Sequence, residues 1–140
     1  MIILDTNVIS ALLKAVPDVP LLNWIYRHPA SSIWTTTINL MELRYGLLIM
    51  PEGHRRRELT RAVGLTLDAK LEGRIAEFDS AAASRTVELM ALRRAKGRPM
   101  ELSDSMIAGV VLSRNALLAT RNVSHFSDLG DKVVNPWEST

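Results

Sequence analysis

Cysteine is absent from the chain, and aromatic side chains are scarce among its 140 residues. Without cysteine there is neither a disulfide framework nor a thiolate metal site, a composition that fits a reducing compartment. Phe, Trp and Tyr make up only 5% of the residues and are not interleaved with the basic runs. A stacking platform for single-stranded nucleic acid is therefore not indicated.

Long apolar runs are absent as well. The chain opens on four apolar residues, 1–4, and Asp5 follows at once. A secretory signal needs a basic start and a longer apolar segment, so none is expected here. No stretch approaches the roughly 20 apolar residues of a membrane span. We therefore expect a cytoplasmic protein that makes no membrane contact.

Charge is nearly balanced, with 17 Lys and Arg against 15 Asp and Glu, a formal net charge of +2. The basic residues concentrate in two runs, His54 to Arg57 and Arg93 to Arg98. Each run either grips nucleic acid or forms a solvated surface, and composition leaves both interpretations open. Histidine shows no paired spacing of metal ligands, so His28, His54 and His125 are interpreted as surface residues.

The length and composition suit one ordinary domain. Apolar residues make up 47% of the chain, enough for a hydrophobic core, and 140 residues are too few for two good domains. No internal repeat or low-complexity tract divides it. We therefore predict a single domain over residues 1–140.

Short apolar or β-branched runs alternate with stretches of helical periodicity. Such alternation predicts an α/β fold with a central, mostly parallel sheet and helices on both faces. Ser103 is the predicted N-cap of the last long helix. In the helix predicted at 80–96, the shared face is Ala83, Val87, Met90, Ala91 and Arg94. Strands are predicted at 1–4, 33–36, 74–78, 116–120 and 132–134, and helices at about 8–13, 21–27, 39–50, 55–71, 80–96 and from 103 onward.

Three acidic residues lie near predicted junctions of strand and helix, where parallel sheets form their sites. Asp5 follows the first strand, and Glu42 falls in the first turn of the helix after the second strand. Asp104 stands at the first position of the helix that begins after Ser103. Each also has a purely structural explanation. Asp5 can cap a helix, Glu42 can complete a capping box with Asn39, and Asp104 can complement a helix dipole.

Convergence of the three carboxylates would require a cation or a proton. A close pair of like charges repels by about 4 kcal/mol at an effective dielectric near 20. Such a cluster persists only if some members are protonated or if it binds a cation. Oxygen ligands without nitrogen or sulfur favour Mg²⁺ or Mn²⁺ over zinc. Spacing alone does not establish that the three side chains meet.

Four segments occur in the order and with the residues of a known family. They are Met1 to Ser10, Thr37 to Gly46, Leu102 to Ala108 and Leu118 to Phe126, and they span nearly the whole chain. Together they resemble the four motifs of PIN-domain toxins of the VapC and FitB type. Asn135-Pro136-Trp137 is similar to the C-terminal segment of the FitB-like branch.

The resemblance implies an α/β sandwich and the hydrolysis of RNA with Mg²⁺ or Mn²⁺ as cofactor. Many PIN domains carry a fourth acidic residue where this chain has Asn122, which adds no charge and leaves open whether one or two metal ions bind. We include Asn122 among the candidate catalytic residues. Carried over by position, the acidic metal ligands are Asp5, Glu42 and Asp104, and the supporting polar residues are Thr6, Asn7 and Thr120.

The resemblance also implies partners. Toxins of this type are normally held by a small cognate antitoxin and are commonly homodimers. The predicted function is therefore that of a metal-dependent endoribonuclease, the toxin of a type II toxin–antitoxin module. Transfer RNA is a candidate substrate, and ribosomal and messenger RNA remain open.

Two other functions remain open from the sequence. The first is a PIN fold kept as a non-catalytic module that binds RNA or protein. The second is a phosphatase with Asp5 as nucleophile. Such phosphatases normally carry a second aspartate two residues later, where this chain has Asn7.

Overall fold

Five parallel strands form one sheet in the order β3-β2-β1-β4-β5. The computed structural model describes residues 1–138, so the last two residues of the predicted domain, 139 and 140, lie outside the described residues. All five predicted strands are present, β2 with the predicted bounds and the others shorter. They are β1 (Ile2–Leu4), β2 (Ile33–Thr36), β3 (Ile75–Ala76), β4 (Leu117–Ala119) and β5 (Val133–Val134).

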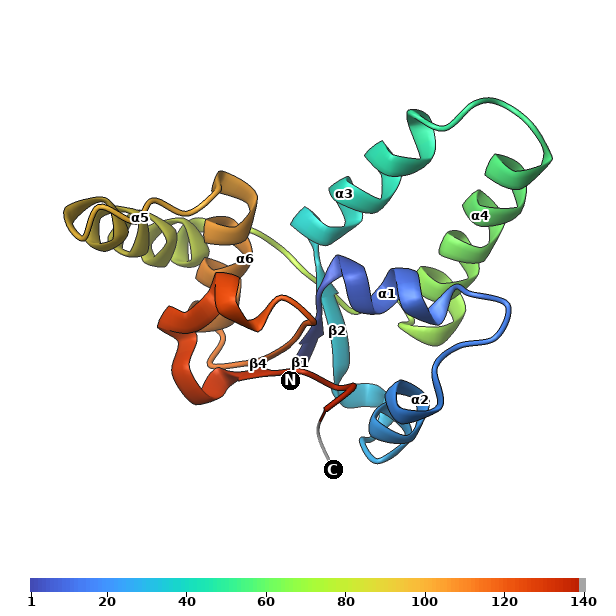
Figure 1. Ribbon diagram of the computed structural model, residues 1–140, viewed down its shortest axis with the longest axis horizontal. Helices are drawn as coiled ribbons and strands as arrows, with labels where there is room; N and C mark the ends of the chain where they lie inside the picture. Colours follow the sequence, from blue (N-terminus) through green and yellow to red (C-terminus); the bar gives the residue numbers. More distant parts are fainter. Residues whose placement is uncertain (139–140) are drawn as a thin grey trace.

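Helices connect the strands and lie on both sides of the sheet (Figure 1). The predicted α/β class, with a parallel sheet, is therefore confirmed. Within residues 1–138 no helix is both long and apolar enough to cross a membrane. The α-helices are α1 (Thr6–Leu12), α2 (Val19–Tyr26), α3 (Thr37–Leu48), α4 (His54–Leu65), α5 (Ser80–Ala95) and α6 (Leu102–Ser113). The other helical segments are η1 (Ala30–Ser32), the π-helical η2 (Thr66–Lys70) and the 3₁₀ segment η3 (Val123–Lys132).

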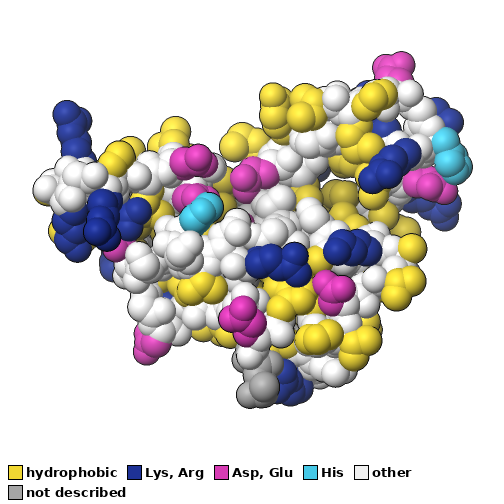
Figure 2. All heavy atoms as spheres, viewed as in Figure 1, with side chains coloured by type: hydrophobic (Ala, Val, Ile, Leu, Met, Phe, Trp, Pro, Cys, Tyr) yellow, Lys and Arg dark blue, Asp and Glu magenta, His cyan; other side chains and the backbone are white. Residues whose placement is uncertain are grey.

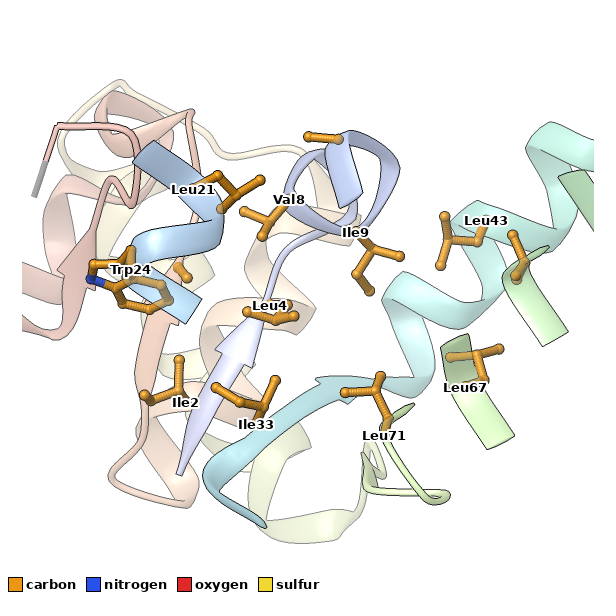
Figure 3. Close-up of a cluster of buried hydrophobic side chains, with 13 residues drawn as sticks. Ile2, Leu4, Val8, Ile9, Leu21, Trp24, Ile33, Leu43, Leu67 and Leu71 are labelled. Atoms are coloured by element: carbon orange, nitrogen blue, oxygen red, sulfur yellow. The ribbon is translucent and has the colours of Figure 1, made fainter. Parts of the chain in front are cut away.

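Two hydrophobic cores cover the two faces of the sheet, because successive side chains of a strand point to opposite faces. In β1, Ile2 and Leu4 pack with α1, α2 and the end of α4, the cluster drawn in Figure 3. Ile3 points the other way and packs with α5 and α6. A strand buried on both faces reads as an unbroken apolar run, which explains the uniformly apolar residues 2–4.

Helices α5 and α6 pack closely at Gly109. A Cβ atom there would lie 1.9 Å from Thr86 Oγ1 and 2.6 Å from the carbonyl oxygen of Ala82. The buried face of α5 consists of Ala82, Thr86 and Leu89. The predicted face, with Val87 and Met90, was wrong: both are exposed. Small residues that allow close approach decided this contact, whereas the prediction followed the larger apolar side chains.

The start of α3 differs from the prediction. Thr36 is the N-cap, and its hydroxyl oxygen accepts the backbone N–H of Asn39. Glu42 therefore lies in the second turn and does not close a capping box with Asn39. The side chain of Asn39 is buried instead.

The start of α6 differs too. The N-cap is Glu101, two residues before the predicted Ser103. Asp104 is accordingly the third residue of the helix rather than the first. This position still lies in the first turn, where a carboxylate is favoured by the helix dipole.

The chain leaves β1 and β4 in opposite directions across the sheet. After β1 it passes through α1 and α2 to β2 on one side, and after β4 it passes through η3 to β5 on the other. Adjacent strands whose connections diverge in this way leave a crevice at their carboxyl ends. Asp5 follows β1 and Thr120 follows β4, so both stand at this crevice.

Candidate functional site

The carboxylate of Asp5 is buried and held by four hydrogen bonds. Asp5 is only 6% exposed to solvent. Oδ1 accepts the backbone N–H of Thr6 at 2.8 Å and Asn39 Nδ2 at 3.0 Å. Oδ2 accepts the hydroxyl of Thr120 at 2.7 Å and Asn7 Nδ2 at 3.3 Å. A carboxylate has about four acceptor positions, so the orientation of Asp5 is fully determined.

Asp5 is also the N-cap of α1, so the purely structural role considered from the sequence is present. That explanation accounts for one of its four hydrogen bonds. The other three come from side chains on α1, on α3 and after β4, which a simple cap does not need. Asp5 thus belongs to a polar network that joins α1, α3 and the end of β4, in addition to its role as a cap.

Thr6 and Asn39 connect Asp5 to Glu42. The hydroxyl of Thr6 donates to Glu42 Oε1 at 2.8 Å and accepts Asn39 Nδ2 at 3.0 Å. Asn39 has no exposed surface and donates from one amide nitrogen to both Asp5 and Thr6. The sequence interpretation missed this role of Asn39. A usable signal was a polar residue at a buried helix position, three residues before the candidate acid.

Thr120 and Asn7 hold the other side of Asp5. Besides donating to Asp5, the hydroxyl of Thr120 accepts Asn7 Nδ2 at 3.1 Å and the backbone N–H of Asn122 at 3.0 Å. The predicted supporting positions are thus brought together around the first aspartate. Asn122 is exposed and contributes its backbone N–H to this network. Asn122 thus contacts the network through its main chain, and its carbonyl oxygen accepts the backbone N–H of His125 at 3.1 Å.

The remaining two acids are in electrostatic contact with Asp5. Partial burial raises the pKa of Glu42, and the negative charges of Asp5, Asp104 and Glu101 raise it further, against the hydrogen bond from Thr6. Partial burial likewise raises the pKa of Asp104, with Asp5 and Glu101 adding to the rise and His125 opposing it. Glu42 and Asp104 therefore ionise less readily than solvated carboxylic acids, because burial and the neighbouring negative charges both disfavour their charged forms.

Two neighbours of Asp104 complete the acidic cluster, and the sequence interpretation assigned neither to the site. His125 Nδ1 lies 3.5 Å from Asp104 Oδ2, although it was interpreted only as a surface residue. Glu101 raises the pKa of both Asp104 and Glu42. Figure 2 shows acidic side chains gathered between α6 and α3, with a histidine beside them. The signal for Glu101 was an acid three residues before Asp104, one helical turn away.

The donor set fits a hard divalent cation. Within residues 1–138 no three His, Cys, Asp or Glu side chains converge closely enough to form a ready-made metal cage. The charge of Asp5 nevertheless acts on both other acids, because it contributes to the raised pKa of Glu42 and to that of Asp104. Carboxylate oxygens with this excess of negative charge suit Mg²⁺ or Mn²⁺, which keep part of their water shell and need few protein ligands. The residues that could hold such an ion are Asp5, Glu42 and Asp104.

A groove leads away from the acidic cluster. It has a volume of about 730 Å³ and is lined by residues of α1, α3, α4 and the turn after α1, including Thr6, Glu42, Lys14 and Arg55. A smaller cavity of about 210 Å³ lies on the other side, between Asp104, His125 and Arg93. The crevice is therefore acidic at its centre and carries cations along both extensions.

The two basic runs are only partly available for a ligand. In the first, Arg55 lines the groove and His54 pairs with Glu58 at 2.9 Å. In the second, Arg93 donates to the carbonyl oxygen of Arg98 and lies 3.3 Å from Asp128. In the second run Arg93 therefore has a structural use, and in the first run Arg55 lies at the groove.

Comparison with known proteins defines the family. Residues 2–132 match the model of the PIN domain. The chain therefore belongs to the PIN-domain family, as its four motifs indicated. It is 40% identical over 139 residues to the VapC ribonuclease Y4jK of Sinorhizobium fredii, covering 99% of each chain.

Two further relatives agree with this result. The tRNA(fMet)-specific endonuclease VapC of Shigella flexneri is 28% identical over 134 residues, 96% of each chain. Among solved structures, FitAB bound to a DNA fragment matches with a TM-score of 0.89 at 26% identity, covering 100% of this chain and 98% of that one. The resemblance to VapC and FitB is thus confirmed in sequence and in fold.

Proposed function

We propose that this chain is a metal-dependent endoribonuclease that acts as the toxin of a type II toxin–antitoxin pair. The observation that carries the proposal is the fully oriented carboxylate of Asp5, at the crevice between β1 and β4, in electrostatic contact with Glu42 and Asp104. The similarity to a VapC ribonuclease over the whole chain supports it. A structural aspartate needs neither so many donors nor two acidic neighbours.

Asp5, Glu42 and Asp104 would hold Mg²⁺ or Mn²⁺, and the ion would lower the pKa of an attacking water and offset charge on the phosphate. Thr120 and Asn39 keep both oxygens of Asp5 in place from opposite sides. At 3.3 Å, the hydrogen bond from Asn7 is the longest of the four and the one most readily exchanged for a cation. The site therefore combines a rigid ligand with one replaceable contact.

Glu42 is suited to take the proton of the water. It accepts the Thr6 hydroxyl through Oε1, so its carboxyl group is held in place at the proposed metal site and can act there as a general base. Attack of the water oxygen on phosphorus breaks the P–O ester bond. The water proton passes to Glu42, and the departing RNA oxygen takes a proton from solvent.

The proposed substrate and the proposed partner are taken from what similar proteins act on and assemble with. Transfer RNA is the first candidate because the Shigella relative is named for it. A cognate antitoxin is proposed because the similar FitAB structure is that of a two-component complex on DNA. Exposed apolar side chains suit a protein partner, be it the antitoxin or a second copy. They lie on and just after α3 and comprise Met41, Tyr45, Leu48 and Ile49.

The decisive experiment compares Asp104→Asn with Asp68→Asn, an exposed acid on η2. We expect the parent and Asp68→Asn to cleave RNA only with Mg²⁺ or Mn²⁺, and Asp104→Asn to be inactive although folded. Titration calorimetry should show metal binding in the first two proteins alone. Full cleavage by folded Asp104→Asn would overturn the proposal, and metal binding without cleavage of any RNA would favour a non-catalytic module.

A further inference from the structure

Arg121 stands at a position that other basic residues do not share. It is the second residue after β4, and elsewhere in residues 1–138 no Lys or Arg falls within two residues after a strand. Its backbone N–H donates to Asn7 Oδ1 at 3.1 Å, and Asn7 Nδ2 contacts Asp5. The main chain of Arg121 is therefore connected to the acidic site through a single side chain.

The guanidinium group of Arg121 is oriented by two partners. Its central carbon lies 3.7 Å from the centroid of the Trp137 ring, a cation–π contact. Nη2 lies 3.7 Å from Asp18 Oδ2, and Trp137 Nε1 donates to that same oxygen at 2.9 Å. A long side chain held in this way loses less conformational entropy when it binds a ligand.

The positive charge of Arg121 remains available to solvent. The side chain is 51% exposed, and that of Asp18 is 41% exposed. An ion pair this exposed is weak because water screens it. Arg74 shows the opposite arrangement: it donates to the carbonyl oxygens of Ile33, Ala30 and Lys70, a purely structural use.

We propose that Arg121 binds a backbone phosphate of the RNA strand, beside the phosphate that is cleaved. This inference rests on the proposed function. A guanidinium presents a planar fork of donors that matches phosphate geometry. Arg121 directly follows Thr120, which donates to Asp5, so a strand with its reacting phosphate at Asp5 would have a neighbouring phosphate available to this side chain. Figure 2 shows basic side chains on the same face as the acidic cluster, over the region of α1.

Two other uses of Arg121 give different results. A structural clasp would only join Trp137 to the loop before α2, and would need Asp18 as much as Arg121. A contact with an acidic protein partner would use the same cation for a carboxylate. Phosphate binding instead predicts opposite effects at the two charged residues. Removing the charge of Asp18 frees the guanidinium and removes a repulsion, whereas removing Arg121 loses the contact.

The test measures binding of a short labelled single-stranded RNA of mixed sequence by fluorescence anisotropy. All variants carry Asp104→Asn, and EDTA is present, so the strand is not cut. Arg121→Gln should weaken binding roughly tenfold at low salt and reduce the slope of log K against log salt by about 0.7. Asp18→Asn should tighten binding. Arg85→Gln, which removes an exposed charge on α5 paired with Glu88, should change neither quantity.

Each alternative outcome overturns the inference in a recognisable way. If Arg121→Gln and Asp18→Asn weaken binding equally and both lower the Tm, Arg121 is only a clasp. If Arg121→Gln binds RNA unchanged but binds a polyglutamate peptide less well, the residue contacts protein. The reference protein carries Asp104→Asn alone. If it binds RNA and the added Arg121→Gln changes neither the affinity nor the salt slope of log K, only this inference fails. If the reference protein shows no salt-dependent binding, the proposed function fails with it.

Discussion

The hydroxyl of Thr120 donates to Asp5 Oδ2 at 2.7 Å, although 115 positions separate the two residues in the chain. The pairing of β1 with β4 brings them together, since Leu4 and Ala119 are partners in the register and each residue that follows leaves the sheet at the same edge. One hydrogen bond thus joins the first and the last of the four sequence motifs. The same hydroxyl accepts hydrogen bonds from Asn7 and from the backbone of Asn122.

Thr120→Val should therefore weaken both the fold and the site. The substitution keeps the shape but leaves a buried carboxylate oxygen without its shortest donor, at a cost of about 1–3 kcal/mol in the free energy of unfolding. Loss of such an orienting partner should also lower RNA cleavage by roughly 10–100-fold. Urea denaturation and cleavage rates measure the two effects. Thr120→Ser, which keeps the hydroxyl, is the control, and equal activity of both variants would contradict the role.

Asn39→Leu tests the residue that the sequence interpretation missed. Leucine has a similar size, but it removes the amide that donates to Asp5 Oδ1 and to Thr6. We expect the affinity for Mg²⁺ to fall by roughly 10–100-fold, as measured by titration calorimetry. Asn23→Leu, on the exposed side of α2, should bind the ion as the parent does. An unchanged affinity in the Asn39 variant would show that Asp5 keeps its orientation without α3.

Glu42→Gln should stabilise the metal-free protein near neutral pH. Burial, together with the charges of Asp5, Asp104 and Glu101, raises the pKa of Glu42 above its usual value of 4.5. The folded state therefore binds a proton more readily than the unfolded state, so the contribution of Glu42 to stability is full below that usual value and is lost as pH rises through the raised pKa. Glutamine carries no charge and avoids this loss.

The measurement is Tm against pH, in EDTA, for the parent and Glu42→Gln. The variant should unfold at a higher temperature near neutral pH, and its advantage should shrink as the pH falls toward the usual carboxyl range. Glu88→Gln, on the exposed face of α5, should show no such advantage. A constant difference between Glu42→Gln and the parent at every pH would show that the effect is not electrostatic.

Gly109→Ala tests the close approach of α5 and α6. The added Cβ would meet Thr86 Oγ1 at 1.9 Å and the backbone oxygen of Ala82 at 2.6 Å, so the helices must move apart. Overpacking of this kind costs about 1–3 kcal/mol in the free energy of unfolding. Gly64→Ala in α4 has no atom within 4 Å of the new Cβ and should instead stabilise by about 0.4–1 kcal/mol. Urea denaturation of both variants gives the comparison.

The parallel sheet and most element positions could be predicted from the sequence, because buried strands and amphipathic helices differ in periodicity. Helix starts were less predictable. Ser103 is a good N-cap by type, yet Glu101 holds that position, and Thr36 replaces the expected Asn39. Several polar residues near a helix start can each cap it, and the packing of the whole helix selects among them.

The sequence by itself determined the family, the order of the elements and the choice of three candidate acids, since these depend on residue types and local spacing. Only the tertiary structure decided what surrounds them. The strand order places Asp5 beside Thr120, and α3 buries Asn39 against that carboxylate. It also brings His125 to Asp104. Contacts between residues far apart in the chain depend on sheet register and helix packing, which local periodicity does not encode.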